Sequence, residues 1–104
     1  MEIEHILKEF RKETEKLYGK KLKNIILYGS WATGEATEDS DIDLAIVLEG
    51  DVAPGKEIDR LIDVITDINL GCGVLISVYP VSEKNYYEVN SPLLLNIRRE
   101  EVPV

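Results

Sequence analysis

Two short motifs hold the residues whose types and spacing could do chemistry. Gly29-Ser30 is followed, after ten intervening residues, by Asp41-Ile42-Asp43 at the head of an apolar run. Asp is disfavoured in strands, and carboxylates at positions i and i+2 of a strand share one face about 6 to 7 Å apart. Two carboxylates that close repel one another, and Mg²⁺, an oxygen-seeking cation, removes the repulsion. The pair therefore predicts a magnesium site at Asp41 and Asp43.

Gly29 and Ser30 predict the other half of such a site. A strand that ends in Gly-Ser and turns into a helical segment exposes backbone N–H groups and a hydroxyl, and glycine lets a phosphate approach the main chain. Taken alone, Gly-Ser is an ordinary strand-to-helix turn and Asp-x-Asp a solvated strand start. Together, at this spacing, they indicate a nucleotide's phosphates held against a carboxylate-bound metal.

Length and charge limit the classes of protein that remain. The 104 residues are expected to form a single domain over 1–104, with 44% hydrophobic and 31% charged residues. Twenty acidic against 12 basic residues give a net charge of -8, which argues against general nucleic-acid binding. No apolar run approaches the ~20 residues that span a bilayer, so no membrane role is expected. With one cysteine and a charged N-terminal stretch, we expect a cytoplasmic protein.

The first half of the chain must position both motifs. Apolar residues at helical spacing predict a helix from Ile3 to about Gly19. A buried strand is expected over 24–28, ending at the Gly-Ser turn. Residues 31–40 are small and polar, which favours one helical turn and then a loop. Ile42 to Leu48 is expected to form the second buried strand.

The second half completes the layers. Helical periodicity returns from about Pro54 to Leu70, and residues 74–81 read as a third strand. Ser82 predicts the start of a short helix, and Ser91 followed by proline predicts another. The expected order is α-β-turn-β-α-β-α-α.

The two motifs and the residues around them resemble those of a known family. The Gly-Ser and Asp-x-Asp pairs, Gly34-Glu35-Ala36 between them, Ser40 to Leu44, and the closing segment LLLNIRREEV resemble the minimal nucleotidyltransferases of the polymerase-beta superfamily. The resemblance implies an α/β fold with a mixed sheet of three or four strands and helices packed mainly on one face.

The resemblance also implies roles for the matched residues. Gly29 and Ser30 would contact the triphosphate of a bound nucleotide. Asp41 and Asp43 would be catalytic and would hold Mg²⁺. Ser40 is either a further nucleotide contact or a cap of the following strand.

Two positions depart from the family pattern. Many relatives carry an arginine where this chain has Thr33, and active members usually carry a further carboxylate on the third strand. The segment VLISVYPV has no acid; Ser77 is the side chain in its interior that could reach the metal, with Tyr79 on the same face next.

The activity implied is Mg²⁺-dependent transfer of a nucleoside monophosphate, AMP from ATP in the first instance, to a hydroxyl on a macromolecular partner. In this family the usual partner is a helical HEPN protein, often a toxin whose antitoxin is the nucleotidyltransferase, and a tyrosine is the expected acceptor. A homodimer is also expected. The alternative is a degenerate, non-catalytic nucleotide-binding module that neutralises a toxin by direct binding. The absent third carboxylate favours this alternative, and the intact Asp pair opposes it.

Overall fold

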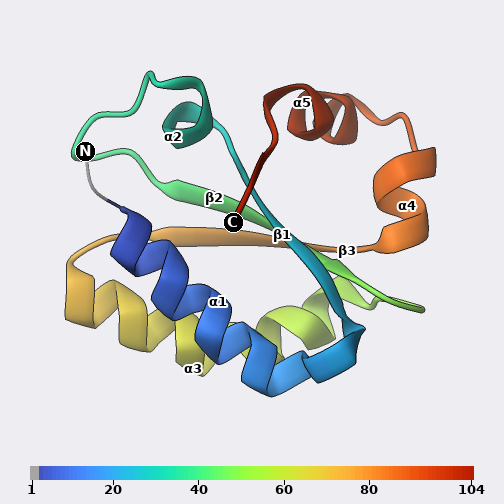
Figure 1. Cartoon of the computed structure of the whole chain (residues 1–104), viewed down its shortest axis with the longest axis horizontal. Coiled ribbons are helices and arrows are strands. Elements are labelled where there is room, and N and C mark those ends of the chain that lie inside the picture. The colour runs from blue at the N-terminus through green and yellow to red at the C-terminus, as the bar shows by residue number, and fades with distance from the viewer. Residues whose placement is uncertain (1–2) are drawn as a thin grey trace.

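A four-stranded mixed sheet forms the centre of the computed structural model, which describes residues 3–104 (Figure 1). The strand order is β3-β2-β1-β4. β1 runs antiparallel to β2 and to β4, whereas β2 and β3 are parallel and joined through a helix. The strands are β1 (Leu22–Tyr28), β2 (Ile42–Leu48), β3 (Ile76–Ser82) and β4 (Val102–Pro103).

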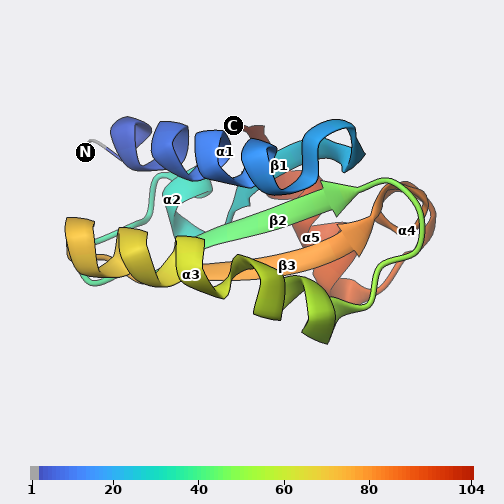
Figure 2. The ribbon, with the colours of Figure 1, turned by 90° about the horizontal axis from the view of Figure 1, so that it is seen from below.

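Helices cover both faces of this sheet (Figure 2). The two long helices pack on one face and the two short C-terminal helices on the other. The expected arrangement has helices mainly on one face, and the two short helices depart from that expectation. A single helical turn follows β1, and a 3₁₀ turn precedes it. The helices are α1 (Glu4–Tyr18), α2 (Ser30–Thr33), α3 (Pro54–Cys72), α4 (Glu83–Glu88) and α5 (Pro92–Glu100), with the 3₁₀ turn at Gly19–Lys21.

β2 is buried on both sides, which explains its nearly unbroken apolar sequence. Ile42, Leu44 and Ile46 belong to the core beneath α1 and α3. Ala45 and Val47 belong to the core beneath α4 and α5. Asp43 shares the face of Ala45 but lies only partly buried, near the start of the strand. A carboxylate is therefore tolerated there because the cover of the sheet is incomplete.

Local signals fix most of the helix ends. Ser82 and Ser91 cap α4 and α5, accepting hydrogen bonds from the backbone N–H of Asn85 at 3.1 Å and of Leu94 at 3.2 Å. α3 begins at Pro54 and ends before Gly73, whose φ of 65° lies in the left-handed region. The predicted starts of α3, α4 and α5 are confirmed, whereas α3 continues to Cys72, two residues beyond the predicted Leu70.

The remaining differences lie at strand boundaries. β1 starts two residues before the predicted 24, and β3 spans 76–82 rather than 74–81. β4 is absent from the predicted order, and the sheet that it completes has four strands, within the three or four expected. Within the part of the chain described, no helix is both long and apolar enough to cross a membrane.

Candidate active site

Three strand ends bring the predicted site residues together at one edge of the sheet. Because β1 is antiparallel to β2, the last residue of β1, Tyr28, lies opposite Asp43 near the start of β2. Because β3 is parallel to β2, Ser77 lies opposite Asp43 on the other side. The Gly-Ser turn after β1 and the Asp pair therefore meet, as the spacing of the motifs predicts.

Gly29 makes the closest approach to the catalytic candidates. Its φ is 76° and its ψ is -158°, a conformation that glycine adopts readily and other residues do not. A Cβ at this position would overlap Oδ2 of Asp43 and would lie 3.3 Å from its Cγ. Glycine is required here both for the backbone angle and for the space that the Asp43 carboxylate occupies.

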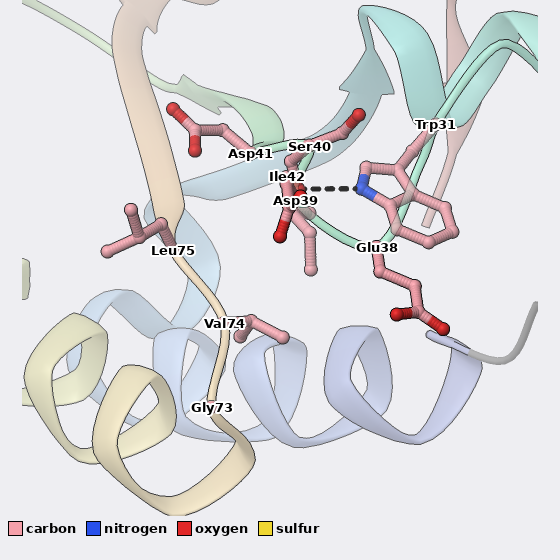
Figure 3. Close-up of a pocket in the computed structure, with 9 residues that line it drawn as sticks. All are labelled: Trp31, Glu38, Asp39, Ser40, Asp41, Ile42, Gly73, Val74 and Leu75. Atoms are coloured by element: carbon pink, nitrogen blue, oxygen red, sulfur yellow. Dashed lines mark hydrogen bonds between the residues drawn. The ribbon is translucent and has the colours of Figure 1, made fainter.

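The carboxylate of Asp43 lies in an unfavourable electrostatic environment. Partial burial raises its pKa first, and the neighbouring carboxylates of Asp41 and Glu100 raise the pKa further. Asp41 is exposed and lies one residue before β2. Figure 3 shows its carboxylate pointing away from Ile42 and Val74, as alternation along an extended chain requires. A cation between these groups would relieve the repulsion.

The donor set suits Mg²⁺ that also binds a substrate. Among residues 3–104, no three His, Cys, Asp or Glu side chains are grouped so that they could hold a metal ion by themselves. Mg²⁺ commonly takes one or two carboxylates together with phosphate oxygens and water. Asp41 and Asp43 can supply the one or two carboxylates of such a site. They cannot by themselves supply a metal site made of protein ligands alone.

The Gly-Ser turn differs from the expected cradle in one respect. The N–H of Gly29 is not free, because it donates a 3.1 Å hydrogen bond to Oε1 of Glu100. The carbonyl of Gly29 accepts from the N–H groups of Ala32 and Thr33 at the start of α2. Gly29 therefore shapes the turn through its conformation and its missing side chain, and its amide is already committed to a protein acceptor.

Ser40 is engaged within the loop that leads to β2. Its hydroxyl accepts a 2.9 Å hydrogen bond from the N–H of Thr37, and its carbonyl accepts from the indole Nε1–H of Trp31 at 3.1 Å (Figure 3). These bonds give Ser40 a structural part in holding the loop. Its contact with a nucleotide remains a prediction.

A hollow of about 370 Å³ lies beside this loop. Trp31, Val74 and Leu75 supply apolar wall, and the loop acids and Asp41 supply a negative rim. Three of its nine lining residues are acidic and none is basic, so it is a poor place for a triphosphate. Trp31 itself packs against the main core.

On the third strand, Ser77 occupies the predicted position. It is exposed and opposite Asp43, and Tyr79 is two residues further along the same face. The strand places no carboxylate beside Asp43, as its sequence indicates.

Two residues close to Asp43, Tyr28 and Glu100, were not among the residues predicted from the sequence. Burial, Asp43, Tyr79 and Glu100 together raise the pKa of Tyr28 to about 12, with burial the largest cause. Tyr28 joins the site through the antiparallel register, which neither motif encodes. Glu100 comes from the far end of the chain. Its segment predicts a helix, but nothing in it indicates which residue that helix meets.

Comparison with known proteins places the chain among nucleotidyltransferase domains. A sequence family described as "Nucleotidyltransferase domain" matches residues 7–103. A protein of Methanocaldococcus jannaschii named "Putative protein adenylyltransferase" is 42% identical over 84 residues, which are 81% of this chain and 78% of the relative. A second protein of that name and organism is 36% identical over 77 residues, 74% of this chain and 77% of the relative.

Proposed function

We propose that this chain, which belongs to the nucleotidyltransferase domain family, transfers AMP from ATP to a hydroxyl group of a partner protein. The observation that carries the proposal is the contact between Gly29, in the turn after β1, and the carboxylate of Asp43. This contact joins an expected phosphate-binding turn to an expected metal-binding pair. The two relatives, both named "Putative protein adenylyltransferase", support a protein as the acceptor.

Each group has a defined part in this reaction. Asp41 and Asp43 would hold Mg²⁺ together with phosphate oxygens of the nucleotide. When bound, Mg²⁺ neutralises charge that develops on the transferred phosphate and the departing pyrophosphate. The turn at Gly29-Ser30 orients the triphosphate. The acceptor oxygen loses its proton to water as it bonds to the α-phosphorus, while the bond from that phosphorus to the β-phosphate oxygen breaks and pyrophosphate leaves.

The partner that we propose is a helical HEPN-type protein, with a tyrosine hydroxyl as acceptor. The resemblance of the motifs to minimal nucleotidyltransferases supports this choice. Exposed apolar surface beside the site also supports a protein acceptor: Leu75 lines the hollow next to Asp41 and is 63% exposed. A partner that presents a hydroxyl near Asp41 would cover such a side chain.

One experiment tests the transfer directly. The chain is incubated with its genomic neighbour, Mg²⁺ and ATP labelled at either the α- or the γ-phosphate. We expect α-label but not γ-label on the neighbour, and a mass increase equal to one AMP residue. The Asp41→Asn/Asp43→Asn variant is the matched control and should transfer none.

A second function is favoured by Ser77, which stands where active relatives usually carry a carboxylate. In that case the chain binds nucleotide and neutralises the partner by contact. If the neighbour stays unmodified, and wild type and the double variant bind it equally tightly and protect cells from it equally, the chain acts by contact alone. That outcome would exclude the transferase.

A further inference from the structure

Glu100 connects the end of the chain to the Gly-Ser turn. It is the last residue of α5, it is half-buried, and its Oε1 accepts the Gly29 N–H at 3.1 Å across 71 residues of sequence. The chain then leaves α5 and runs along β1 (Figure 1). There, Val102 lies opposite Leu27, and the N–H of Val104 donates to the carbonyl of Ile25 at 2.9 Å. These bonds hold Glu100 over the end of β1.

The bond adds a restraint on the turn besides those that α2 supplies. The Gly29 carbonyl is held by the N–H groups of Ala32 and Thr33. The Gly29 N–H belongs to the preceding peptide, which is oriented by Glu100. Glycine is the residue with the most conformational freedom to lose, so a turn built on it needs such restraints.

The Glu100 carboxylate acts on the carboxylate of Asp43. It raises the pKa of Asp43, and among the residues described it takes part in no salt bridge. A second carboxylate beside Asp43 adds repulsion that a neutral acceptor would avoid. Its hydrogen bond to the turn is the compensating contact that the structure provides.

We propose that Glu100 is a positioning residue of the nucleotide site: by accepting the Gly29 N–H, it holds the Gly29-Ser30 turn in the conformation that receives the triphosphate beside Asp43. The inference rests on the proposed function, since it assigns the turn to a nucleotide. Glu100 acts through Gly29 and does not itself contact substrate. Its loss therefore affects nucleotide binding more than the chemical step.

The first test is the affinity for Mg-ATP, measured by titration calorimetry. Because a hydrogen bond to a charged group is lost, we expect Glu100→Ala to weaken binding about tenfold, with KM raised more than kcat is lowered. Glu100→Gln keeps an acceptor oxygen and should recover most of that loss. Glu9→Ala, at an exposed position of α1, is the matched control. Equal affinities of wild type and Glu100→Ala, or equal losses in the Ala and Gln variants, would overturn the proposal.

A second control separates positioning from general loosening of α5. Glu101, the next residue, accepts a hydrogen bond from the Tyr86 hydroxyl and, among the residues described, makes no hydrogen bond to the turn. Glu101→Ala should lower the melting temperature yet bind Mg-ATP as wild type does. A loss of affinity in Glu101→Ala as large as that in Glu100→Ala would show that both act through folding alone.

The third readout needs no nucleotide. Hydrogen exchange of the Gly29 amide, followed by NMR in the free protein, should be faster in Glu100→Ala than in wild type. Exchange in Glu100→Gln should be slower than in Glu100→Ala. If wild type binds no nucleoside triphosphate, the proposed function fails, and this exchange still decides whether Glu100 holds the turn. Unchanged exchange in Glu100→Ala would refute the positioning role even if ATP binds.

Discussion

Gly29 and Asp43 are in direct contact across the β1–β2 pair: a Cβ on residue 29 would overlap Oδ2 of Asp43 and lie 3.3 Å from its Cγ. Gly29 also has a positive φ of 76°. The turn and the carboxylate are thus a single packing unit. A change in either residue must move the other.

Gly29→Ala tests that unit. Alanine at this φ is expected to cost about 1–2 kcal/mol of folding free energy, and its methyl group displaces the Asp43 carboxylate. We expect transferase activity to fall by about 100-fold or more, since an ångström of misplacement is enough for such a loss. Urea denaturation and AMP transfer are measured in parallel.

Gly50→Ala is the matched control for the backbone. Gly50 has a similar φ of 82°, but nothing lies within 4 Å of a Cβ built there. This variant should lose comparable stability and keep its activity. Equal inactivation of both variants would mean that the Gly29 effect comes from instability alone.

Asp43→Asn should separate stability from activity. Its raised pKa means that the fold disfavours the ionised carboxylate, so the charge lowers stability at neutral pH and the lost stability is regained as pH falls. Removing the charge should raise the melting temperature at pH 7, while transfer falls by about 100-fold or more. Calorimetric melting curves give the first quantity and label transfer the second. A lower melting temperature for Asp43→Asn would contradict the assigned environment.

Magnesium provides an independent check on the same pair. Any ligand that binds only the folded state raises the melting temperature. Millimolar MgCl₂ with ATP should stabilise wild type and leave the Asp41→Asn/Asp43→Asn variant unchanged. NaCl at the same ionic strength, added with ATP in place of MgCl₂, serves as the control for nonspecific screening, since screening alone should affect both proteins alike.

Ser77→Asp asks whether the third strand limits the reaction. Ser77 is exposed opposite Asp43, so an aspartate there adds the carboxylate that the strand lacks. We expect a several-fold increase in kcat at saturating Mg²⁺, together with lower stability in its absence because three carboxylates then repel. Ser82→Asp, at the other end of β3 and still able to cap α4, is the control. An unchanged or lower kcat for Ser77→Asp would show that Ser77 is not the limiting position.

The parts of this site that could be predicted are those encoded locally. Gly29-Ser30 and Asp41-x-Asp43 each mark a strand end, and their spacing brings them together once β1 and β2 pair. Tyr28 and Glu100 could not be found in the same way. Tyr28 is placed by the register of β1 against β2. Glu100 is placed by α5, and it is 71 residues from Gly29 in the sequence. β4 gave too little signal, because a two-residue strand has no periodicity to detect.

The packing of α1 on α3 gives a prediction away from the site. The hydroxyl of buried Tyr18 donates a 2.9 Å hydrogen bond to Oε1 of Glu57, and burial followed by this carboxylate raises the pKa of Tyr18. Tyr18→Phe should cost about 1 kcal/mol at pH 7, the usual worth of one hydrogen bond. The difference should narrow above pH 10. There the unfolded wild type releases the Tyr18 proton while the folded protein keeps it, so rising pH adds a loss of stability from this site that the Phe variant does not have. Urea denaturation of both proteins between pH 7 and 11 measures the difference, and a gap that widens with pH would contradict the assigned bond.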